Sequence, residues 1–218
     1  MRLRTACYAD QTRCWPASGR HILAQFDAET IVVYQAYRPE IGRYAIEHGK
    51  FGGEFSFSRM SWVKPNFLWM MYRSDWGRSS GQEVVLALRL RRTFFDRLLH
   101  EAVWSTFQPA ASVTQQEWQA AIKSSDVRLQ WDPDHLPTGQ PCERRAIQIG
   151  IRGEMLKAYG QRELLDVTDM TEFVTAQREL AATWRDERLQ TPVEEVYLPA
   201  NLETARRVGL DVTGPETT

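Results

Sequence analysis

Runs of β-branched, aliphatic and aromatic residues predict the strands of this chain. Residues 31–37 (IVVYQAY) are apolar and β-branched, which is typical of a buried strand. Residues 82–91 (QEVVLALRLR) begin as a continuous apolar run and then alternate leucine with arginine, as a strand with one wetter face does. Shorter extended segments are expected over residues 58–63, 127–131, 145–151 and 164–167.

Proline, glycine and capping residues mark the expected helices. Pro39 begins a helix that runs to His48 and stops at Gly49, because proline suits the first helical turn and glycine the residue after the last. A second helix is expected from Pro65 to about Ser74, and its apolar residues surround the axis, which indicates burial. The other expected helices are residues 93–104 with Thr93 as the cap, 118–123, 153–159, and 169–190 with Thr168 as the cap.

Proline-rich and polar stretches predict the loops and the chain ends. Residues 133–141 hold three prolines and are expected to form a rigid loop, and residues 108–116 a second loop. Residues 1–29 are expected to be irregular, and the polar tail from Asn201 to be frayed.

The order of these elements indicates the fold class. Strands and helices intermix without regular β–α–β alternation, which favours the α+β class over a doubly wound fold. We expect a single domain over residues 1–218, with a core of about 28–200, a mixed β-sheet with flanking helices, and less ordered ends.

Composition and charge exclude several broad classes. The chain has 218 residues, of which 43% are hydrophobic and 25% charged, as in ordinary globular proteins. A net charge of -1 gives no global basic field, so any contact with nucleic acid must come from a local patch. No apolar run approaches the roughly 20 residues of a membrane span, and the N-terminus lacks the apolar segment of a signal peptide. With three cysteines expected as reduced thiols, we expect a cytoplasmic protein and no membrane partner.

Several kinds of site lack their signature in the sequence. Neither a phosphate-binding loop (GxxxxGK[ST]), a dinucleotide fingerprint (GxGxxG) nor a hydrolase elbow (GxSxG) occurs. The four histidines are not paired at metal-ligand spacing, so no metal is expected.

The most informative stretch is residues 59–77 (RMSWVKPNFLWMMYRSDWG). Its nineteen residues hold five aromatics, three methionines and three cations. Aromatic faces beside cations suit a flat anionic ligand such as a nucleotide, although a core helix with cations at its ends is the simpler interpretation. Ser61 and Lys64 would precede the helix N-terminus, where unpaired amides and Lys64 hold a phosphate and Arg59 or Arg73 adds a bidentate contact.

Polar residues at the ends of two strands are further candidates. Gln35, Tyr37 and Arg38 end the first long strand, a place where sites are often built. Glu83 enters the next long strand after Gln82, where a carboxylate orients a ribose hydroxyl or stabilises a developing cation. For Tyr37 and Arg38 the structural alternative is a partly buried tyrosine beside a surface arginine. For Glu83 it is a solvent-exposed strand end.

Gln148 stands in the middle of an expected strand, between Ile147 and Ile149. A polar side chain at such a position must find a partner or face a cleft. Asp132 directly follows the neighbouring expected strand, residues 127–131, and we group it with Gln148 as a candidate site residue. A satisfied buried glutamine is the alternative.

Six segments together resemble a known family. In order along the chain they are QAYRP, RMSWVKPNFLWMMYRSDWG, GQEVVLAL, LQWDPD, RRAIQIGI and VTDMTEFV. From about residue 31 to residue 197 the chain resembles the family catalogued as domain of unknown function 4291, and the long block is the most specific part. That resemblance implies a relation to the ADP-ribosyltransferase fold, and in particular to the DarT-like enzymes that attach ADP-ribose from NAD to DNA bases.

The relation implies a split, mixed sheet with NAD as co-substrate in a central cleft. Such an enzyme packs the nicotinamide with aromatics, holds the diphosphate with cations and places an acid near the ribose. The expected cofactor-binding residues are Gln35, Tyr37, Arg38, Arg59, Ser61, Trp62, Lys64, Tyr72 and Arg73. The expected catalytic residues are Glu83, Asp132 and Gln148.

The chain departs from the best-known patterns of that class. Neither an Arg-Ser-Glu nor a His-Tyr-Glu triad is placed, and Gln148 stands in the late strand where a catalytic Glu is expected. Three functions therefore stay open: an NAD-dependent ADP-ribosyltransferase with DNA or RNA as acceptor, a non-catalytic module for nucleotides or single-stranded nucleic acid, and an interaction protein whose aromatic helix is only core.

Overall fold

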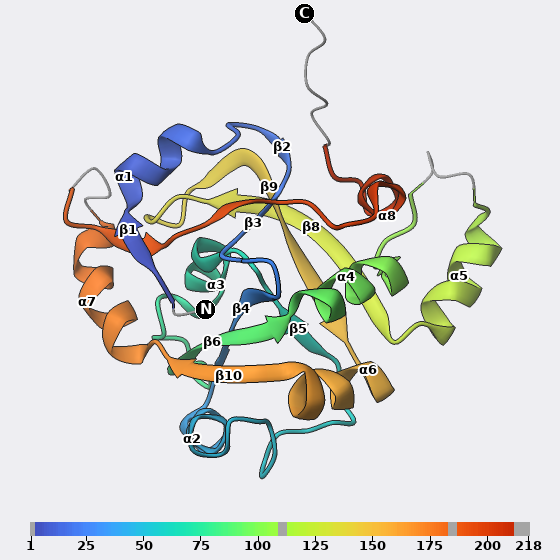
Figure 1. Cartoon of the computed structure of the whole chain (residues 1–218), viewed down its shortest axis with the longest axis horizontal. Coiled ribbons are helices and arrows are strands. Elements are labelled where there is room, and N and C mark those ends of the chain that lie inside the picture. The colour runs from blue at the N-terminus through green and yellow to red at the C-terminus, as the bar shows by residue number, and fades with distance from the viewer. Residues whose placement is uncertain (1–2, 109–112, 183–186, 212–218) are drawn as a thin grey trace, which may run out of the picture.

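Strands from both halves of the chain alternate with short helices (Figure 1). The structure is a computed structural model and describes residues 3–108, 113–182 and 187–211. Among these residues the strands are β1 (Thr5–Cys7), β2 (Gly19–Arg20), β3 (Ile22–Ala24), β4 (Thr30–Tyr37), β5 (Ser61–Val63), β6 (Val84–Arg91), β7 (Val103–Trp104), β8 (Val127–His135), β9 (Pro141–Ile151), β10 (Leu164–Asp169), β11 (Gln190–Pro192) and β12 (Glu195–Tyr197). The helices are α1 (Tyr8–Gln11), α2 (Pro39–His48), α3 (Phe67–Ser74), α4 (Arg92–Glu101), α5 (Gln115–Ser124), α6 (Gly153–Ala158), α7 (Thr171–Ala181) and α8 (Leu202–Arg207), with a 3-10 turn at Thr12–Cys14 and a π-helical turn at Tyr159–Glu163.

Two main sheets carry the fold. The first is antiparallel, with the strand order β10–β6–β4. The second is mixed, with the order β2–β9–β8–β7 and with β5 also paired to β9. A single backbone bridge between Tyr34 of β4 and Lys64, just after β5, joins the two. The result is one α+β domain built on a curled, mixed sheet. The expected α+β class and the expected single domain with a mixed sheet are therefore confirmed.

Strands β4 and β6 are buried on both faces, which explains the continuous apolar runs of their sequences, whereas the edge strand β10 is largely exposed. In β4, Ile31 and Val33 belong to one hydrophobic core, whereas Val32 and Tyr34 belong to another. β6 alternates in the same way between the two cores. Successive side chains of a strand point to opposite faces, so a sheet covered on both sides needs apolar residues at every position.

Different helices cover the two faces. The buried side of α4, which includes Phe94, Phe95 and Leu98, belongs to the core between the two main sheets. The other core is built around α3, six of whose eight residues are buried, and it also takes in Val174 of α7. Figure 1 shows α4 between the sheets and α7 at the far edge from α5 and α8.

The predicted helix α2 is confirmed at both ends. It begins at Pro39 and ends at His48, and Gly49 adopts a φ of 63°. A left-handed residue after the last turn is the usual reason for glycine there. The predicted second helix begins two residues later than expected, at Phe67, because the side chain of Asn66 caps it.

The prediction that residues 1–29 are irregular is wrong. β1 pairs with β11, β2 with β9 and β3 with β12, so three N-terminal strands are completed by residues from the second half of the chain. The core consequently extends outside the expected residues 28–200, and it includes Ile22 and Leu210. The expected frayed tail is helical over α8, and residues 212–218 lie outside the described residues.

The expected rigid loop over residues 133–141 is confirmed for residues 136–140, but both of its ends belong to strands. β8 continues through Pro133 to His135, and β9 begins at Pro141. Pro133 is tolerated because the register shifts between it and His135, and proline in a sheet is found at such irregularities.

Two predicted helices end earlier than expected. α4 stops at Glu101 and its first residue is Arg92, so Thr93 is not its cap, and β7 then pairs in parallel with β8. α7 covers Thr171–Ala181 rather than residues 169–190, since Asp169 ends β10 and Gln190 begins β11. Residues 183–186 of that expected helix lie outside the described residues.

Candidate functional site

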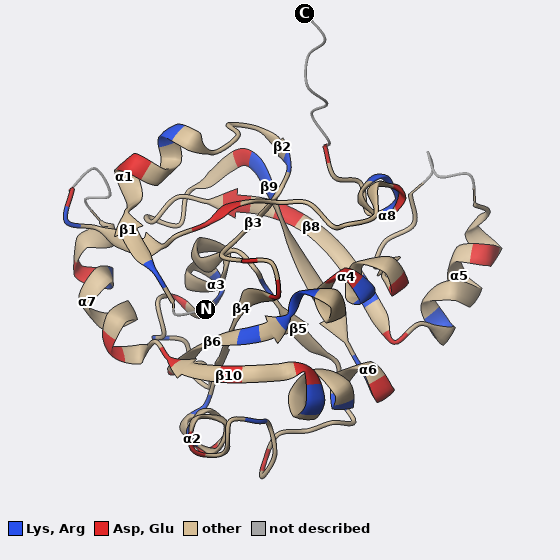
Figure 2. Cartoon of the chain, in the orientation of Figure 1, with Lys and Arg blue, Asp and Glu red and all other residues tan. Residues whose placement is uncertain are grey.

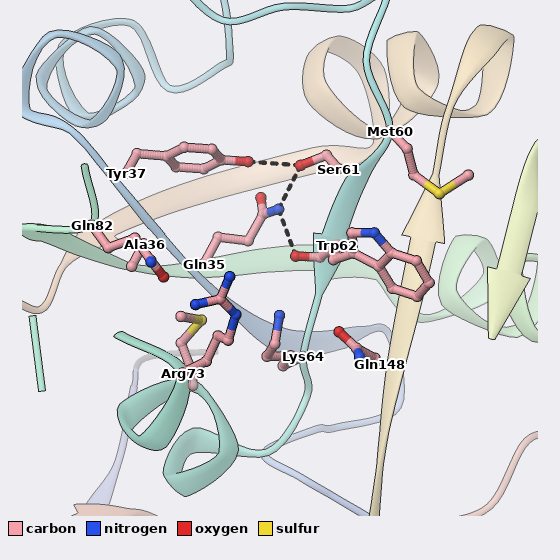
Figure 3. A pocket seen from close by; sticks show the side chains of 11 residues that line it. Gln35, Ala36, Tyr37, Met60, Ser61, Trp62, Lys64, Arg73, Gln82 and Gln148 are labelled. Atoms are coloured by element: carbon pink, nitrogen blue, oxygen red, sulfur yellow. Dashed lines mark hydrogen bonds between the residues drawn. The ribbon is translucent and has the colours of Figure 1, made fainter. Parts of the chain in front are cut away.

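A cavity of about 260 Å³ opens at the seam between the two sheets. It lies where the end of β4, the segment from β5 to α3, and the middle of β9 come together (Figure 3). Its lining residues are Gln35, Ala36, Tyr37, Met60, Ser61, Trp62, Lys64, Met70, Arg73, Gln82 and Gln148. The structure therefore brings together seven of the twelve candidate site residues at one place.

Lys64 is the most unusual residue of this cavity. Its backbone pairs with Tyr34, and its side chain is only 4% exposed. Within the described part of the chain its ammonium group has no hydrogen-bond or ion-pair partner, and its nearest aromatic neighbour is the Trp69 ring, 5.7 Å from Nζ to the centroid. Burial, with the nearby Arg73 guanidinium, lowers the pKa of Lys64 to about 8, while the charge of Asp132 acts in the opposite direction.

Arg73 places a second cation in the same cavity. It lies in the last turn of α3, and Figure 3 shows its guanidinium pointing into the space above Lys64. Like Lys64, it has no ion pair or hydrogen bond to any residue that the structure describes. No Asp or Glu is among the lining residues. Lys64 is buried, so its ammonium lacks a partner that an anionic ligand would supply, whereas Arg73 is exposed and remains in contact with solvent.

Two amides in the first turn of α3, where we predicted a phosphate, are occupied by protein side chains. The amide of Phe67 donates to Oε1 of the buried Glu194 at 2.7 Å, and the amide of Trp69 donates to Oδ1 of Asn66 at 2.7 Å. These two donors are therefore not free for an anion. An anion in the cavity would be held mainly by Lys64 and Arg73.

Four side chains form a hydrogen-bonded chain along the cavity wall. Tyr159 Oη donates to Gln35 Oε1 at 2.6 Å, which fixes the orientation of the Gln35 amide. Gln35 Nε2 then donates to Ser61 Oγ at 2.8 Å and to the carbonyl of Trp62 at 3.0 Å. Both amide hydrogens of Gln35 are therefore used within the protein, so Gln35 positions Ser61.

Ser61 and Tyr37 together offer one hydroxyl proton to a ligand. Their oxygens are 2.8 Å apart, and either hydroxyl can donate to the other. Burial raises the pKa of Tyr37, so its hydroxyl keeps its proton at neutral pH. One of the two hydroxyl protons forms the hydrogen bond between Ser61 and Tyr37. Whichever residue donates it, the other hydroxyl still has its proton for an acceptor in the cavity.

Gln148 lines the cavity and Asp132 lies behind it. Gln148 Nε2 donates to Asp132 Oδ2 at 2.7 Å, and Gln130 Nε2 donates to Asp132 Oδ1 at 2.7 Å. Asp132 pairs across the β8–β9 ladder two residues from the Gln130–Gln148 pair. The predicted polar group on these strands therefore exists, and its glutamine rather than its carboxylate faces the cavity.

Glu83 does not line the cavity. Its Oε1 accepts a hydrogen bond from the amide of Gly81 at 2.8 Å, and its Oε2 is buried without a partner among the described residues. The carboxylate thus stabilises the turn before β6, whereas its neighbour Gln82 lines the cavity.

A glycine on the neighbouring strand leaves room for the Trp62 side chain. Trp62 pairs with Gly150 across β5 and β9. A Cβ atom at Gly150 would lie 2.8 Å from Met60 Sδ and 3.0 Å from the Trp62 ring. The glycine therefore makes room for both side chains to reach the cavity.

Arg38 and Arg59 line a second, adjoining cavity of about 480 Å³. The two cavities share the residues Tyr37, Met60 and Ser61. Arg38 is exposed and forms an ion pair with Glu54, while Arg59 has no partner in the described chain.

Tyr72 lies outside both cavities. It is 48% exposed, and its ring stacks on the buried His135 at 3.6 Å between centroids. The sequence predicted Tyr72 as a cofactor-binding residue, on the same helical stripe as Trp69 and Arg73. In α3, however, Met70 and Arg73 line the cavity and Tyr72 does not.

Sequence analysis missed Tyr159 as part of the site. It is fully buried and follows α6, 124 residues after Gln35, to which it donates its hydroxyl. No local pattern marks such a pair.

Four other features of the described residues concern metal-binding groups, disulfides, membrane-spanning helices and the distribution of charge. No group of three or more His, Cys, Asp or Glu residues in this part of the chain is arranged to hold a metal ion. Cys7, Cys14 and Cys142 are free thiols. Within the same residues no helix has both the length and the apolar character needed to cross a membrane. Basic and acidic residues are interspersed along the ribbon in Figure 2.

Comparison with known protein families gives one result. Residues 21–197 match the family described as Domain of unknown function (DUF4291). A comparison with curated proteins found no match. The matched residues include every residue that lines the cavity.

Proposed function

The chain belongs to the DUF4291 family, and we propose that it binds NAD in the cavity at the sheet seam and transfers ADP-ribose to nucleic acid. One observation carries this proposal. Lys64 and Arg73, two cations without partners among the described residues, line one cavity from which acidic side chains are absent. A diphosphate beside a flat ring supplies the negative charge that such a cavity lacks.

The volumes of the two adjoining cavities support a ligand that extends into both of them. Ligand sites commonly have volumes of about 300–1,000 Å³. The inner cavity of about 260 Å³ alone is below this range, and the adjoining one of about 480 Å³ extends it past Tyr37 and Ser61. We assign the diphosphate to Lys64 and Arg73, and the unpartnered Arg59 of the adjoining cavity to a second charged part of the ligand.

The aromatic and amide side chains suit the nicotinamide end. Trp62 and Tyr37 offer flat apolar surfaces, and Gln82 lines the same cavity. The hydroxyl proton left over by Ser61 and Tyr37 is available to an acceptor such as a carboxamide or ribose oxygen.

The reaction breaks the bond between the nicotinamide nitrogen and C1′ of the ribose. The bonding electrons leave with nicotinamide, C1′ becomes positive, and a nucleophilic atom of the acceptor then bonds to C1′ and loses its proton. Negative charge near C1′ favours this step. Asp132 is the nearest candidate for that charge, because one hydrogen bond links it to the cavity-lining Gln148.

A second function is favoured by a separate observation. The cavity is lined by three glutamines, Gln35, Gln82 and Gln148, and by no carboxylate. A site without an acid beside the ribose suits a protein that binds a nucleotide without cleaving it.

Labelled NAD distinguishes the two functions. We would incubate the protein with NAD labelled on the adenylate phosphate, alone and with single-stranded DNA, RNA or cell lysate, and measure both released nicotinamide and label bound to macromolecules. Transfer of label that is lost in Arg73→Ala and Asp132→Asn supports the transferase. Binding of NAD without nicotinamide release supports the binding module, and absence of both binding and release refutes both functions.

Glu83→Gln tests the alternative acid. Because the Glu83 carboxylate is used in the turn at Gly81, we expect this variant to keep its turnover. Loss of turnover in a folded Glu83→Gln variant would assign the acid to Glu83 instead of Asp132.

A further inference from the structure

Lys64 differs from the other three lysines of the chain. Lys50, Lys123 and Lys157 are exposed, and Lys157 is paired with Glu154 at 2.7 Å. Lys64 alone is buried, and its amine lies on the wall of a cavity. A lysine in such surroundings has a different chemistry from a solvated one, since a desolvated amine beside another cation gives up its proton more readily.

Charged groups on two elements face this amine. Arg73 of α3 disfavours the ammonium form, and Asp132 of β8 favours it. The Trp69 ring, on the first turns of α3, offers its face at 5.7 Å. Burial and Arg73 prevail, and they bring the pKa of Lys64 to about 8, so that about half of the molecules carry the free amine at pH 8.

We propose that Lys64 is a reactive amine that forms an imine with a small phosphate-bearing aldehyde, whose phosphate is held by Arg73. Figure 3 shows both side chains pointing into the cavity, with the Arg73 guanidinium beside the Lys64 side chain in this view. The cavity of about 260 Å³ suits a compound of this small size. This reaction uses the same cavity as the proposed transferase, so the two ligands would exclude each other, but it goes beyond the transferase because it does not require NAD.

The reaction balances with groups that are present. The lone pair of Lys64 Nζ attacks the carbonyl carbon, and the carbonyl oxygen takes up a proton to give a carbinolamine. Nζ gives up one proton to solvent, and the hydroxyl takes up a second proton and leaves as water. The Nζ lone pair then forms the carbon–nitrogen double bond, which leaves a protonated imine. The Ser61–Tyr37 pair, which keeps one free hydroxyl proton, lines the same cavity and can donate a hydrogen bond to the carbonyl oxygen.

The Arg73 guanidinium gives the site its preference for a phosphate. Its planar donors match phosphate oxygens in a bidentate manner. A phosphate bound there also places the aldehyde of a short molecule next to Lys64, which raises the effective concentration of the two reacting groups. A neutral aldehyde of the same length lacks both advantages.

The test compares two aldehydes that differ by one phosphate. The full-length protein is incubated at pH 8 with glyceraldehyde 3-phosphate or with glyceraldehyde, and the imine is reduced with cyanoborohydride. Trypsin releases residues 60–73 as one peptide, in which Lys64 is the sole lysine. Mass spectrometry then compares that peptide with those that hold Lys50, Lys123 and Lys157, which serve as internal controls in the same molecule.

We expect the phosphorylated aldehyde to label Lys64 at least about ten times more than any other lysine, and glyceraldehyde to label Lys64 clearly less than the phosphorylated aldehyde does. Excess inorganic phosphate should suppress labelling of Lys64 only. Arg73→Ala should remove the preference for the phosphorylated aldehyde, and Arg78→Ala should keep it. Equal labelling of all four lysines, or a Lys64 signal indifferent to phosphate, overturns the inference.

The wild-type comparison is sufficient by itself, so misfolding of a variant does not decide the outcome. NAD turnover is measured on the same preparation. Turnover without Lys64 labelling rejects the imine and keeps the transferase, whereas labelling without turnover does the reverse.

Discussion

Tyr34 and Lys64 exchange two backbone hydrogen bonds across the seam between the two main sheets. The amide of Tyr34 donates to the carbonyl of Lys64 at 2.7 Å, and the amide of Lys64 donates to the carbonyl of Tyr34 at 3.3 Å. Tyr34 belongs to the three-stranded sheet, and Lys64 follows a strand of the other. The pair therefore fixes the point at the cavity from which the Lys64 side chain leaves the backbone.

Replacing Lys64 with methionine should stabilise the empty protein at neutral pH. The folded state lowers the Lys64 pKa from 10.5 to about 8, so between these values the unfolded chain binds more protons and the stability of the wild type rises with pH. Since each pKa unit is worth 1.36 kcal/mol, the cost of the buried charge at pH 7 is on the order of 3 kcal/mol.

Urea denaturation at pH 7 and pH 9.5 measures this effect. The difference between the wild type and Lys64→Met should be large at pH 7 and smaller at pH 9.5. Lys157→Met, at an exposed lysine, should show no such pH dependence. A Lys64→Met protein that is less stable than the wild type at both pH values would contradict the prediction.

Arg73→Ala should weaken binding of ADP-ribose by about 10–100-fold. A hydrogen bond to a charged group contributes about 1.5–3 kcal/mol, and Arg73 has no partner among the described residues to compete with the ligand. Arg78→Ala is the matched control, because Arg78 lies close by in the sequence but is paired with Asp75 at 2.7 Å outside the cavity. Titration calorimetry at fixed salt gives both affinities, and equal losses in the two variants would argue against an anion at Arg73.

Tyr159→Phe should destabilise the protein by about 1–3 kcal/mol, because Gln35 Oε1 loses its donor while it stays buried. Freed from this bond, the Gln35 amide can rotate, so Ser61 should also lose its fixed position and ligand affinity should fall. Tyr44→Phe is the control, since the Tyr44 hydroxyl has no hydrogen bond to another described residue. Urea denaturation of the two variants, with ligand titration on each, separates the structural effect from the effect on the site.

Glu194→Gln should stabilise the protein more at pH 8 than at pH 5. Burial raises the pKa of Glu194 well above 4.5, although the amide of Phe67 partly opposes this. Above pH 4.5 the folded state keeps a proton that the unfolded chain releases, so the wild type loses stability as the pH rises. Glutamine keeps an oxygen acceptor for Phe67 and has no proton to lose.

The gain should increase steadily from pH 5 to pH 8, because the proton that the folded wild type retains becomes more costly as the pH rises. Thermal unfolding of the wild type and Glu194→Gln across pH 5–8 measures it. Parallel curves for the two proteins would show that Glu194 has an ordinary pKa.

By itself the sequence determined the elements whose evidence is local. The apolar run of β6 and the proline and glycine at the ends of α2 could be predicted, because side-chain periodicity and backbone preferences act within a few residues. Of the site residues predicted in the 59–77 block, Ser61, Trp62, Lys64 and Arg73 line the cavity, whereas Arg59 and Tyr72 do not. The intermixed order of strands and helices was likewise enough to predict the α+β class.

Only the tertiary structure decided the features that join distant residues. The N-terminal strands form because their partners, β9, β11 and β12, arrive more than 100 residues later, and strand pairing has no local signature. The same holds for the site: Tyr159 meets Gln35, Gln148 stands in front of Asp132, and Glu194 takes the α3 terminus that Lys64 was expected to share. A hydrogen bond or an unpaired buried charge depends on which groups meet in three dimensions, and folding determines that.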